Sequence, residues 1–100
     1  MVRFLVLYDT PADPAAFERH YREVHIPLAQ KLPGLRRYTV SRNATGVRGE
    51  PYYLIGELEW DDMAALREAF QSPEGRATAQ DISTFAGGIV RSMIYEVEEI

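Results

Sequence analysis

The sequence contains no cysteine in 100 residues. This excludes disulfide bonds, a thiol nucleophile and a thiolate metal site, and nothing indicates an oxidising compartment. Long hydrophobic runs are also missing: the apolar stretch after Met1 is too short for a signal peptide, and none reaches the roughly 20 residues of a membrane span. We therefore expect a cytoplasmic protein with no membrane partner, and the length predicts one small domain over residues 1–100.

Positive charge is scarce. Fifteen acidic residues against eleven basic ones give a net charge of -4, and Lys31 is the only lysine. Because nucleic-acid-binding proteins present a basic face, we expect no nucleic-acid partner. Four arginines lie close together in the middle of the chain, where they fit either an anion site or, the interpretation we favour, cross-strand pairing with Glu57 and Glu59. These arginines are Arg36, Arg37, Arg42 and Arg48.

Motifs for cofactors and metals are absent as well. The sequence has no glycine-rich dinucleotide or phosphate loop and no nucleophile elbow, so we expect no cofactor. Its two histidines, His20 and His25, are five residues apart, which places them about 140° apart around a helix. Two histidines that bind one metal ion from a single helix are usually four residues apart, so we expect no metal. A weak site of two histidines and one carboxylate, with Glu57, stays open.

The apolar periodicity alternates between the strand and helix patterns along the chain. The predicted strands are Val2–Tyr8, Leu35–Asn43, Tyr52–Trp60 and Ile89–Glu98. The predicted helices run from a cap at Asp13 to Pro33-Gly34, and from a cap at Asp61 through Asp62–Gln71 and a restart at Ser72-Pro73 to about Phe85. This order predicts an α+β ferredoxin-like βαββαβ fold. Its four-stranded antiparallel sheet has both helices on one face and the first and third strands at the centre.

The first helix has an apolar stripe at helical spacing, formed by Phe17, Tyr21, Val24 and Leu28. Pro27 interrupts this stripe because it lacks an N–H group and its ring crowds the preceding turn. Ile26, just before it, is expected to leave helical angles. We therefore predict a kink or restart beside His25, which would aim the imidazole inward.

Both faces of the first and last strands are apolar, although helices are expected on only one. Phe4 and Val6 lie on one face of the first strand and Leu5 and Leu7 on the other. An uncovered apolar face is an association surface. The sequence therefore predicts a homodimer in which two sheets face one another and enclose a cavity.

A hairpin between the second and third strands would place Tyr38 opposite Glu57, Arg36 opposite Glu59 and Val40 opposite Ile55. Tyr38 and Glu57 would then point away from the helices into the dimer cavity, and a slip of one residue would reverse this. Histidine moves protons near neutral pH and a phenol can donate to an oxyanion, so His25 and Tyr38 are the candidate catalytic residues. The alternative is that His25 caps the broken helix and Tyr38 fills the cavity.

Three further residues are candidates for binding the substrate. Tyr21 lies four residues before His25 and would brace its ring. Glu57 would contribute a carboxylate to the cavity. His20 lies between charged residues, which also fits a surface or core role.

Two motifs carry a likeness to a known family: F-x-x-H-Y-x-x-x-H-x-P-L at Phe17–Leu28 and P-G-L-x-x-Y at Pro33–Tyr38. With S-P-E-G at Ser72–Gly75 and D-x-x-x-F at Asp81–Phe85, they resemble the EthD family of dimeric α/β-barrel proteins. The resemblance implies a ferredoxin-like protomer in a homodimer and places His25, Tyr21 and Tyr38 at family positions. Similar barrels include methylmuconolactone isomerases, polyketide cyclases and cofactor-free monooxygenases.

Two functions follow from these observations. The first is an enzyme that moves a proton next to the carbonyl of a small organic metabolite through His25 and Tyr38, as an isomerase, cyclase or cofactor-free oxygenase does. The second is a non-catalytic barrel that binds such a ligand as an accessory of an oxidative degradation pathway. A hydrogen bond from His25 to Tyr38 or to a carboxylate, facing an open pocket, would favour the enzyme.

Overall fold

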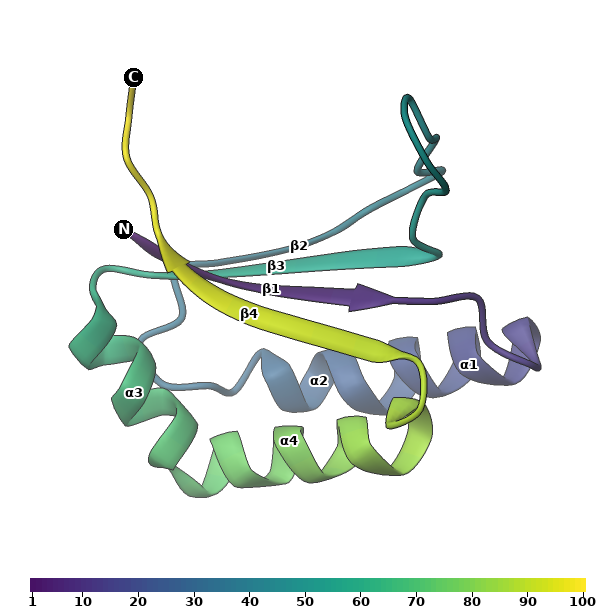
Figure 1. Ribbon diagram of the computed structural model, residues 1–100. Coiled ribbons are helices and arrows are strands. Elements are labelled where there is room, and N and C mark those ends of the chain that lie inside the picture. Colours follow the sequence, from purple (N-terminus) through teal and green to yellow (C-terminus); the bar gives the residue numbers. More distant parts are fainter.

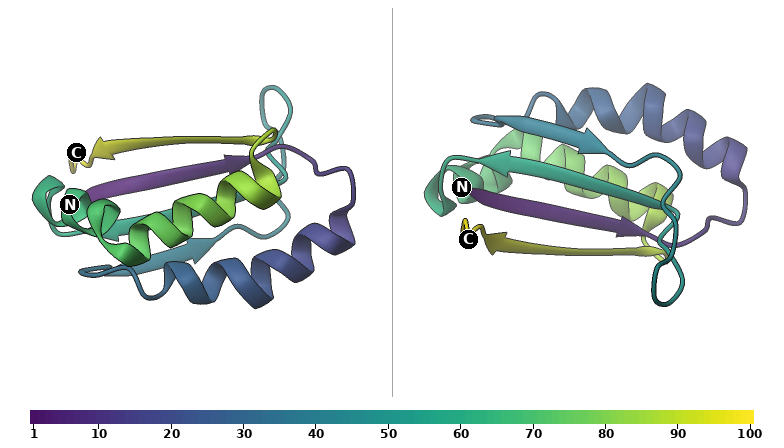
Figure 2. Two further views of the ribbon diagram at one scale, coloured as in Figure 1. Left: turned by 90° about the horizontal axis from the view of Figure 1, so that it is seen from below. Right: turned by 90° about the horizontal axis from the view of Figure 1, so that it is seen from above.

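The computed structural model describes residues 1–100 and has two layers, a sheet and a set of helices (Figure 1). The sheet is antiparallel, in the order β2-β3-β1-β4, and consists of β1 (Val2–Tyr8), β2 (Arg37–Val40), β3 (Leu54–Trp60) and β4 (Val90–Glu96). The helical segments are α1 (Pro14–His20), the π-helical turn η1 (Tyr21–His25), α2 (Ile26–Ala29), α3 (Met63–Gln71) and α4 (Pro73–Ala86). All of them lie on one face of the sheet, as both views in Figure 2 also show. The predicted ferredoxin-like α+β fold, with β1 and β3 central, is confirmed.

Local side-chain caps set where the helices begin. Asp13 accepts a hydrogen bond from the Ala16 N–H at the start of α1. At α3 the cap is Asp62, which accepts from the Ala65 N–H at 2.8 Å, and the predicted cap at Asp61 is wrong. Asp61 instead binds the guanidinium of Arg36 through both carboxylate oxygens, at 3.1 and 2.8 Å. Each of the two neighbouring aspartates therefore has its own partner.

The core lies between the helices and the sheet. Side chains of β3 alternate strictly, and Leu54, Leu58 and Trp60 are buried on the helix side. Trp60 is fully buried and donates its indole N–H to the Pro33 carbonyl at 2.9 Å, which ties the loop after α2 to the sheet. This anchoring fixes how far α2 and the residues before β2 lie from the strands.

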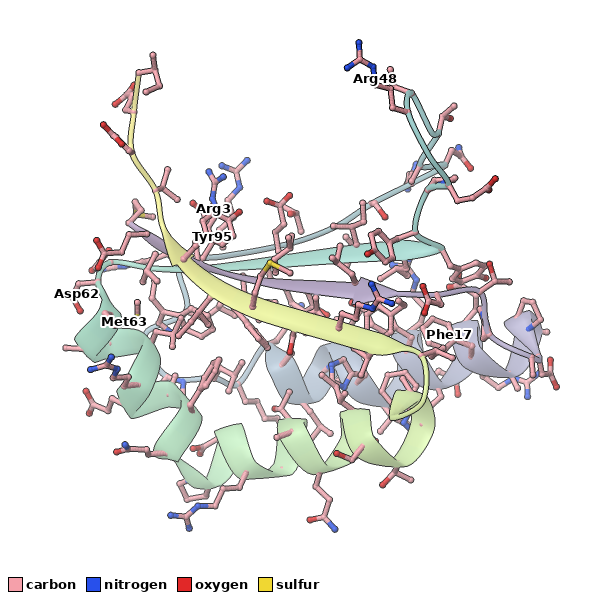
Figure 3. The ribbon with its side chains drawn as sticks, viewed as in Figure 1. Arg3, Phe17, Arg48, Asp62, Met63 and Tyr95 are labelled. Carbon is pink, nitrogen blue, oxygen red and sulfur yellow. The ribbon has the colours of Figure 1, made fainter.

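The other face of the sheet carries no helix. In Figure 3 Arg3 and Tyr95 project away from the helices, whereas Phe17 lies between α1 and the sheet. Met93 and Tyr95 on this open face are 48% and 36% exposed. The loop around Arg48 and the C-terminal tail both rise on the same side (Figures 1 and 3). None of the helices is long and apolar enough to cross a lipid bilayer.

The predicted register of β2 against β3 is wrong by one residue. Tyr38 pairs with Leu58, Thr39 with Glu57, and Arg37 with Glu59. Tyr38 therefore faces the helices, and Glu57 lies on the open face. The loop between the two strands runs from residue 41 to residue 53, too long for turn geometry to impose a register. The packing of Tyr38 beneath the helices sets it instead.

Candidate active site

The helix that carries both histidines is continuous, so the predicted break at Pro27 is wrong. Ile26 keeps helical angles, with φ -57° and ψ -48°. The chain instead widens to a π-helical turn over η1, in which the Ile26 N–H donates to the Tyr21 carbonyl five residues earlier. Pro27, which has no N–H to donate, follows this turn, where the backbone hydrogen bonds again join residues four apart. The proline thus marks the end of a wide turn.

The wide turn changes which residues the helix buries. His25 is 3% exposed, and with Phe17, Tyr21 and Ala29 it forms a buried stripe at steps of four. The predicted stripe placed Val24 inside, but Val24 is 40% exposed. An extra residue in the turn rotates the later side chains around the axis, so the histidine takes the core position that ordinary helical spacing gives to the valine.

One carboxylate binds both histidines. Asp81 on α4 lies 2.9 Å from His25 Nδ1 through Oδ2 and 2.7 Å from His20 Nε2 through Oδ1. Phe85, one helical turn further along, packs against both imidazole rings, with ring centroids 4.6 Å from His20 and 5.2 Å from His25. The D-x-x-x-F motif therefore acts as one unit that orients the two rings.

This hydrogen bond selects the tautomer of His25. An ionised carboxylate can only accept a hydrogen bond, so Nδ1–H of His25 is the donor and the lone pair stays on Nε2. Burial lowers the pKa of His25 from 6.5, while the hydrogen bond and the charge of Asp81 oppose that shift. The imidazole is therefore neutral at pH 7. Nε2 has no hydrogen-bond partner in the protein. It is not among the fully buried polar atoms, so it borders accessible space.

A pair of tyrosine hydroxyls lies beside this imidazole. Tyr21 and Tyr38 are joined by a hydrogen bond of 2.7 Å between their oxygens. Burial raises the pKa of both phenols, and the bond from Tyr21 works in the opposite direction on Tyr38. Either hydroxyl can be the donor of this bond. When Tyr21 is the donor to Tyr38, the proton of Tyr38 is available to a third group.

These groups share a small cavity between the sheet and the helices. It has a volume of about 20 Å³, and its walls include His25, Tyr21, Tyr38 and Tyr8, which leaves room for about one water molecule. Gly56 on β3 is part of the same wall, and a Cβ there would lie 3.4 Å from the Tyr21 hydroxyl. A methyl group there would just contact the hydroxyl pair. We refer to this space as the inner cavity.

The predicted site residues fall into two groups. His25, Tyr38 and Tyr21 meet at the inner cavity, which lies within this one chain between its sheet and its helices and not on the open sheet face. Glu57 lies on the opposite face of the sheet and cannot reach them. His20 contacts the far side of Asp81, and its side chain is 32% exposed. No set of three or more histidines and carboxylates is arranged to hold a metal ion.

Asp81 and Tyr8 were not among the predicted site residues. Asp81 is 56 residues from His25 in sequence, beyond the reach of any local spacing argument. Its one signal was the D-x-x-x-F likeness, which places a carboxylate and an aromatic ring on one helical face. Tyr8 is the last residue of an apolar strand, whose pattern is typical of a structural core, and it is only 1% exposed. Its position next to Tyr21, with ring centroids 5.7 Å apart, follows from the tertiary fold.

Comparison with known families matches residues 9–89 to the EthD domain. This protein belongs to the EthD family. It is 38% identical over 101 residues to an uncharacterized 11.0 kDa protein in the thcB-thcC intergenic region of Rhodococcus erythropolis, covering 99% of this chain and 96% of that one. It is also similar to the crystal structure of an EthD family protein from Bacillus halodurans. That match has a TM-score of 0.91 and 39% identity, and covers 98% of this chain and 99% of the other.

Two less similar crystal structures share the fold. One is a dimeric ferredoxin-like protein of unknown function from Thermobifida fusca, with a TM-score of 0.71, 15% identity, and coverage of 96% of this chain and 90% of that one. The other is SnoaB, a cofactor-independent oxygenase from Streptomyces nogalater, with a TM-score of 0.67, 19% identity, and coverage of 99% and 94%. The sheet and helices of this EthD protein thus occur in proteins of more than one kind.

Proposed function

We propose that this EthD protein is an enzyme that moves a proton on a small organic molecule held at the inner cavity, with His25 as general base. The observation that carries the proposal is the state of His25: buried, bonded to a carboxylate through Nδ1, and unbonded at Nε2. An imidazole held in this way is suited to accept a proton at Nε2, because the carboxylate stabilises the imidazolium that forms.

The neighbouring hydroxyls complete the proposed reaction. His25 Nε2 takes a proton from a C–H group next to a carbonyl, and the electron pair left behind moves onto the carbonyl oxygen. Tyr38 donates a hydrogen bond to this oxygen, and Tyr21 supports Tyr38 through the 2.7 Å bond. Return of the proton from His25 to another atom gives an isomerase or cyclase. Reaction of the carbanion with dioxygen would give an oxygenase, the activity named for SnoaB.

The second candidate is a non-catalytic barrel that binds an apolar ligand for a partner in an oxidative degradation pathway. The mainly apolar walls around the site fit binding as well as catalysis. The proposed enzyme is favoured because the His25–Asp81 bond gives the imidazole a defined tautomer. Binding alone does not require that arrangement.

Deuterium exchange tests the proposal without knowledge of the natural substrate. In D₂O the protein is expected to speed C–H exchange in cyclohexanone or phenylacetone about 100-fold or more over the same concentration of free imidazole, as followed by proton NMR. Because the pKa of His25 is lowered from 6.5, the midpoint of its protonation lies below that pH. The fall in rate on acidification should therefore have its midpoint below pH 6.5. An exchange rate equal to that of imidazole, or a fall in rate with its midpoint above pH 6.5, would contradict the proposal.

We also propose that two copies associate through the open sheet face. That face combines Leu5 and Ile55 with Met93 and Tyr95, which are 48% and 36% exposed, and no helix of the same chain lies over it. The Thermobifida fusca protein that shares the fold is dimeric. The inner cavity lies on the helix side of the sheet, so each protomer would keep a site of its own.

A charge placed on the open face is expected to separate the two copies. Met93→Glu should give a monomer at micromolar concentration in analytical ultracentrifugation, because an unpaired carboxylate would be buried in the interface. Ile94→Glu is the matched control: Ile94 is the next residue on β4, is 42% exposed, and lies on the helix side of the sheet. A Met93→Glu protein that sediments like the Ile94→Glu control would refute this interface.

A further inference from the structure

A second cavity lies next to the inner one. It has a volume of about 190 Å³, and its walls include Phe70, Gly75 and Ala79 from the helices and Ser92 from β4. We call it the outer pocket. The two cavities share four of their lining residues, so they adjoin one another. The shared residues are Phe4, Leu32, Thr78 and Ile82. Ala79 and Ser92 are both exposed, which places them at the mouth of the outer pocket.

The sizes of the two cavities indicate which part of a ligand each of them can hold. The inner cavity, at about 20 Å³, admits only the reacting end of a ligand. The outer pocket, at about 190 Å³, is close to the roughly 150 Å³ at which an apolar cavity holds benzene. A ligand that reaches His25 must therefore place its bulk in the outer pocket, and one ring of ordinary size fills it.

The chemistry of the walls excludes charge. No aspartate, glutamate, lysine or arginine lines either cavity, and the polar groups of the outer pocket are the hydroxyls of Thr78 and Ser92. Placing a carboxylate or phosphate there would strip its water without supplying a partner. Three larger depressions elsewhere, of about 540, 620 and 250 Å³, carry charged residues in their walls and do not include His25.

We infer that the outer pocket is the substrate pocket of this enzyme and selects a neutral molecule with a single ring and one carbonyl or hydroxyl group. That group enters the inner cavity and meets His25 and Tyr38, while the ring packs against Phe4, Phe70 and Ile82. The mouth passes Ala79 and Ser92 on the helix side of the sheet, where a second copy docked on the open face leaves it uncovered. The inference rests on the proposed function, because it names the substrate class of the same site.

Binding, measured apart from turnover, tests the inference. Cyclohexanone titrated into ¹⁵N-labelled protein is expected to shift the amide signals of Thr78, Ala79 and Ser92. The anion 4-oxocyclohexanecarboxylate, which has the same ring, should bind at least about tenfold more weakly. Ala79→Phe should abolish the shifts by filling the mouth, and Ser92→Tyr should do the same from the opposite wall. Ala77→Phe is the matched control, because Ala77 is exposed on the same helix but does not line the pocket.

Several results would overturn the inference. These are equal binding of the anion, unchanged binding by both mouth variants, shifts confined to the charged depression around Arg22 and Arg42, or no shift at millimolar cyclohexanone. Deuterium exchange in the same samples separates this inference from the proposed function. Binding without exchange supports the pocket and refutes the proton transfer, whereas exchange that survives Ala79→Phe and Ser92→Tyr refutes the pocket alone.

Discussion

Asp81→Leu is expected to lower the rate of proton exchange by about 100- to 10,000-fold, the range for loss of a general base. Leucine is close to aspartate in shape but cannot accept a hydrogen bond. His25 Nδ1 then loses its partner at 2.9 Å, and nothing holds the lone pair on Nε2 toward the inner cavity. The loss should approach that of His25→Gln, although the imidazole is still present. Asp81 would thus be a positioning residue.

The pH profile separates this effect from a change in protonation. Asp81 raises the pKa of His25 against the larger effect of burial, so its removal lowers that pKa further. The imidazole of Asp81→Leu is therefore neutral over a wider pH range, and raising the pH should not restore the rate. Asp81→Asn should lose less, because its amide oxygen can accept from His25 while its amide nitrogen donates to His20.

His20→Gln is the control for the same carboxylate. It changes the partner on the solvent side of Asp81 and leaves the His25 bond in place. We expect it to retain most of the rate. The nitrogen chemical shifts of His25 should report the Nδ1–H tautomer in the wild type and in His20→Gln, and a mixture in Asp81→Leu. Wild-type activity in Asp81→Leu would show that the carboxylate has no part in positioning the base.

The parts of the fold that were predictable rest on short-range rules. The alternation along β3, the proline after the Ser72 cap and the strand order follow from side-chain periodicity, capping and the handedness of crossovers. Each of these depends on a few neighbouring residues, so the sequence alone contains the information. The family motifs placed Tyr21, His25 and Tyr38 together, and these three residues do meet at one cavity.

The errors arose where several local conformations compete. At Pro27 the steric rule for the preceding residue favours a break, but a π-helical turn keeps Ile26 helical and buries His25. Between β2 and β3 a long loop leaves two registers open, and the hydrogen bond between the hydroxyls of Tyr21 and Tyr38 fits only one of them. Contacts between distant segments decided both cases.

The hydroxyl pair permits a double-mutant test in which stability and activity are expected to separate. Tyr38→Phe leaves the Tyr21 hydroxyl, on a side chain only 1% exposed, without its partner at 2.7 Å. A buried donor left unpaired costs about 1–3 kcal/mol of unfolding free energy. The same variant loses the donor to the developing oxyanion, which should lower the exchange rate by about 100- to 1,000-fold.

Removing both hydroxyls should restore stability but not activity. In Tyr21→Phe/Tyr38→Phe no buried hydroxyl is left unpaired, so the unfolding free energy from urea denaturation should return close to the wild-type value. The exchange rate should stay as low as in Tyr38→Phe, because the oxyanion still has no donor. Tyr21→Phe alone keeps the Tyr38 hydroxyl at the cavity and should lose less of the rate. A double variant that regained exchange activity would remove Tyr38 from the reaction. One that stayed as unstable as Tyr38→Phe would mean that the hydroxyl of Tyr21 needs no partner where it is buried.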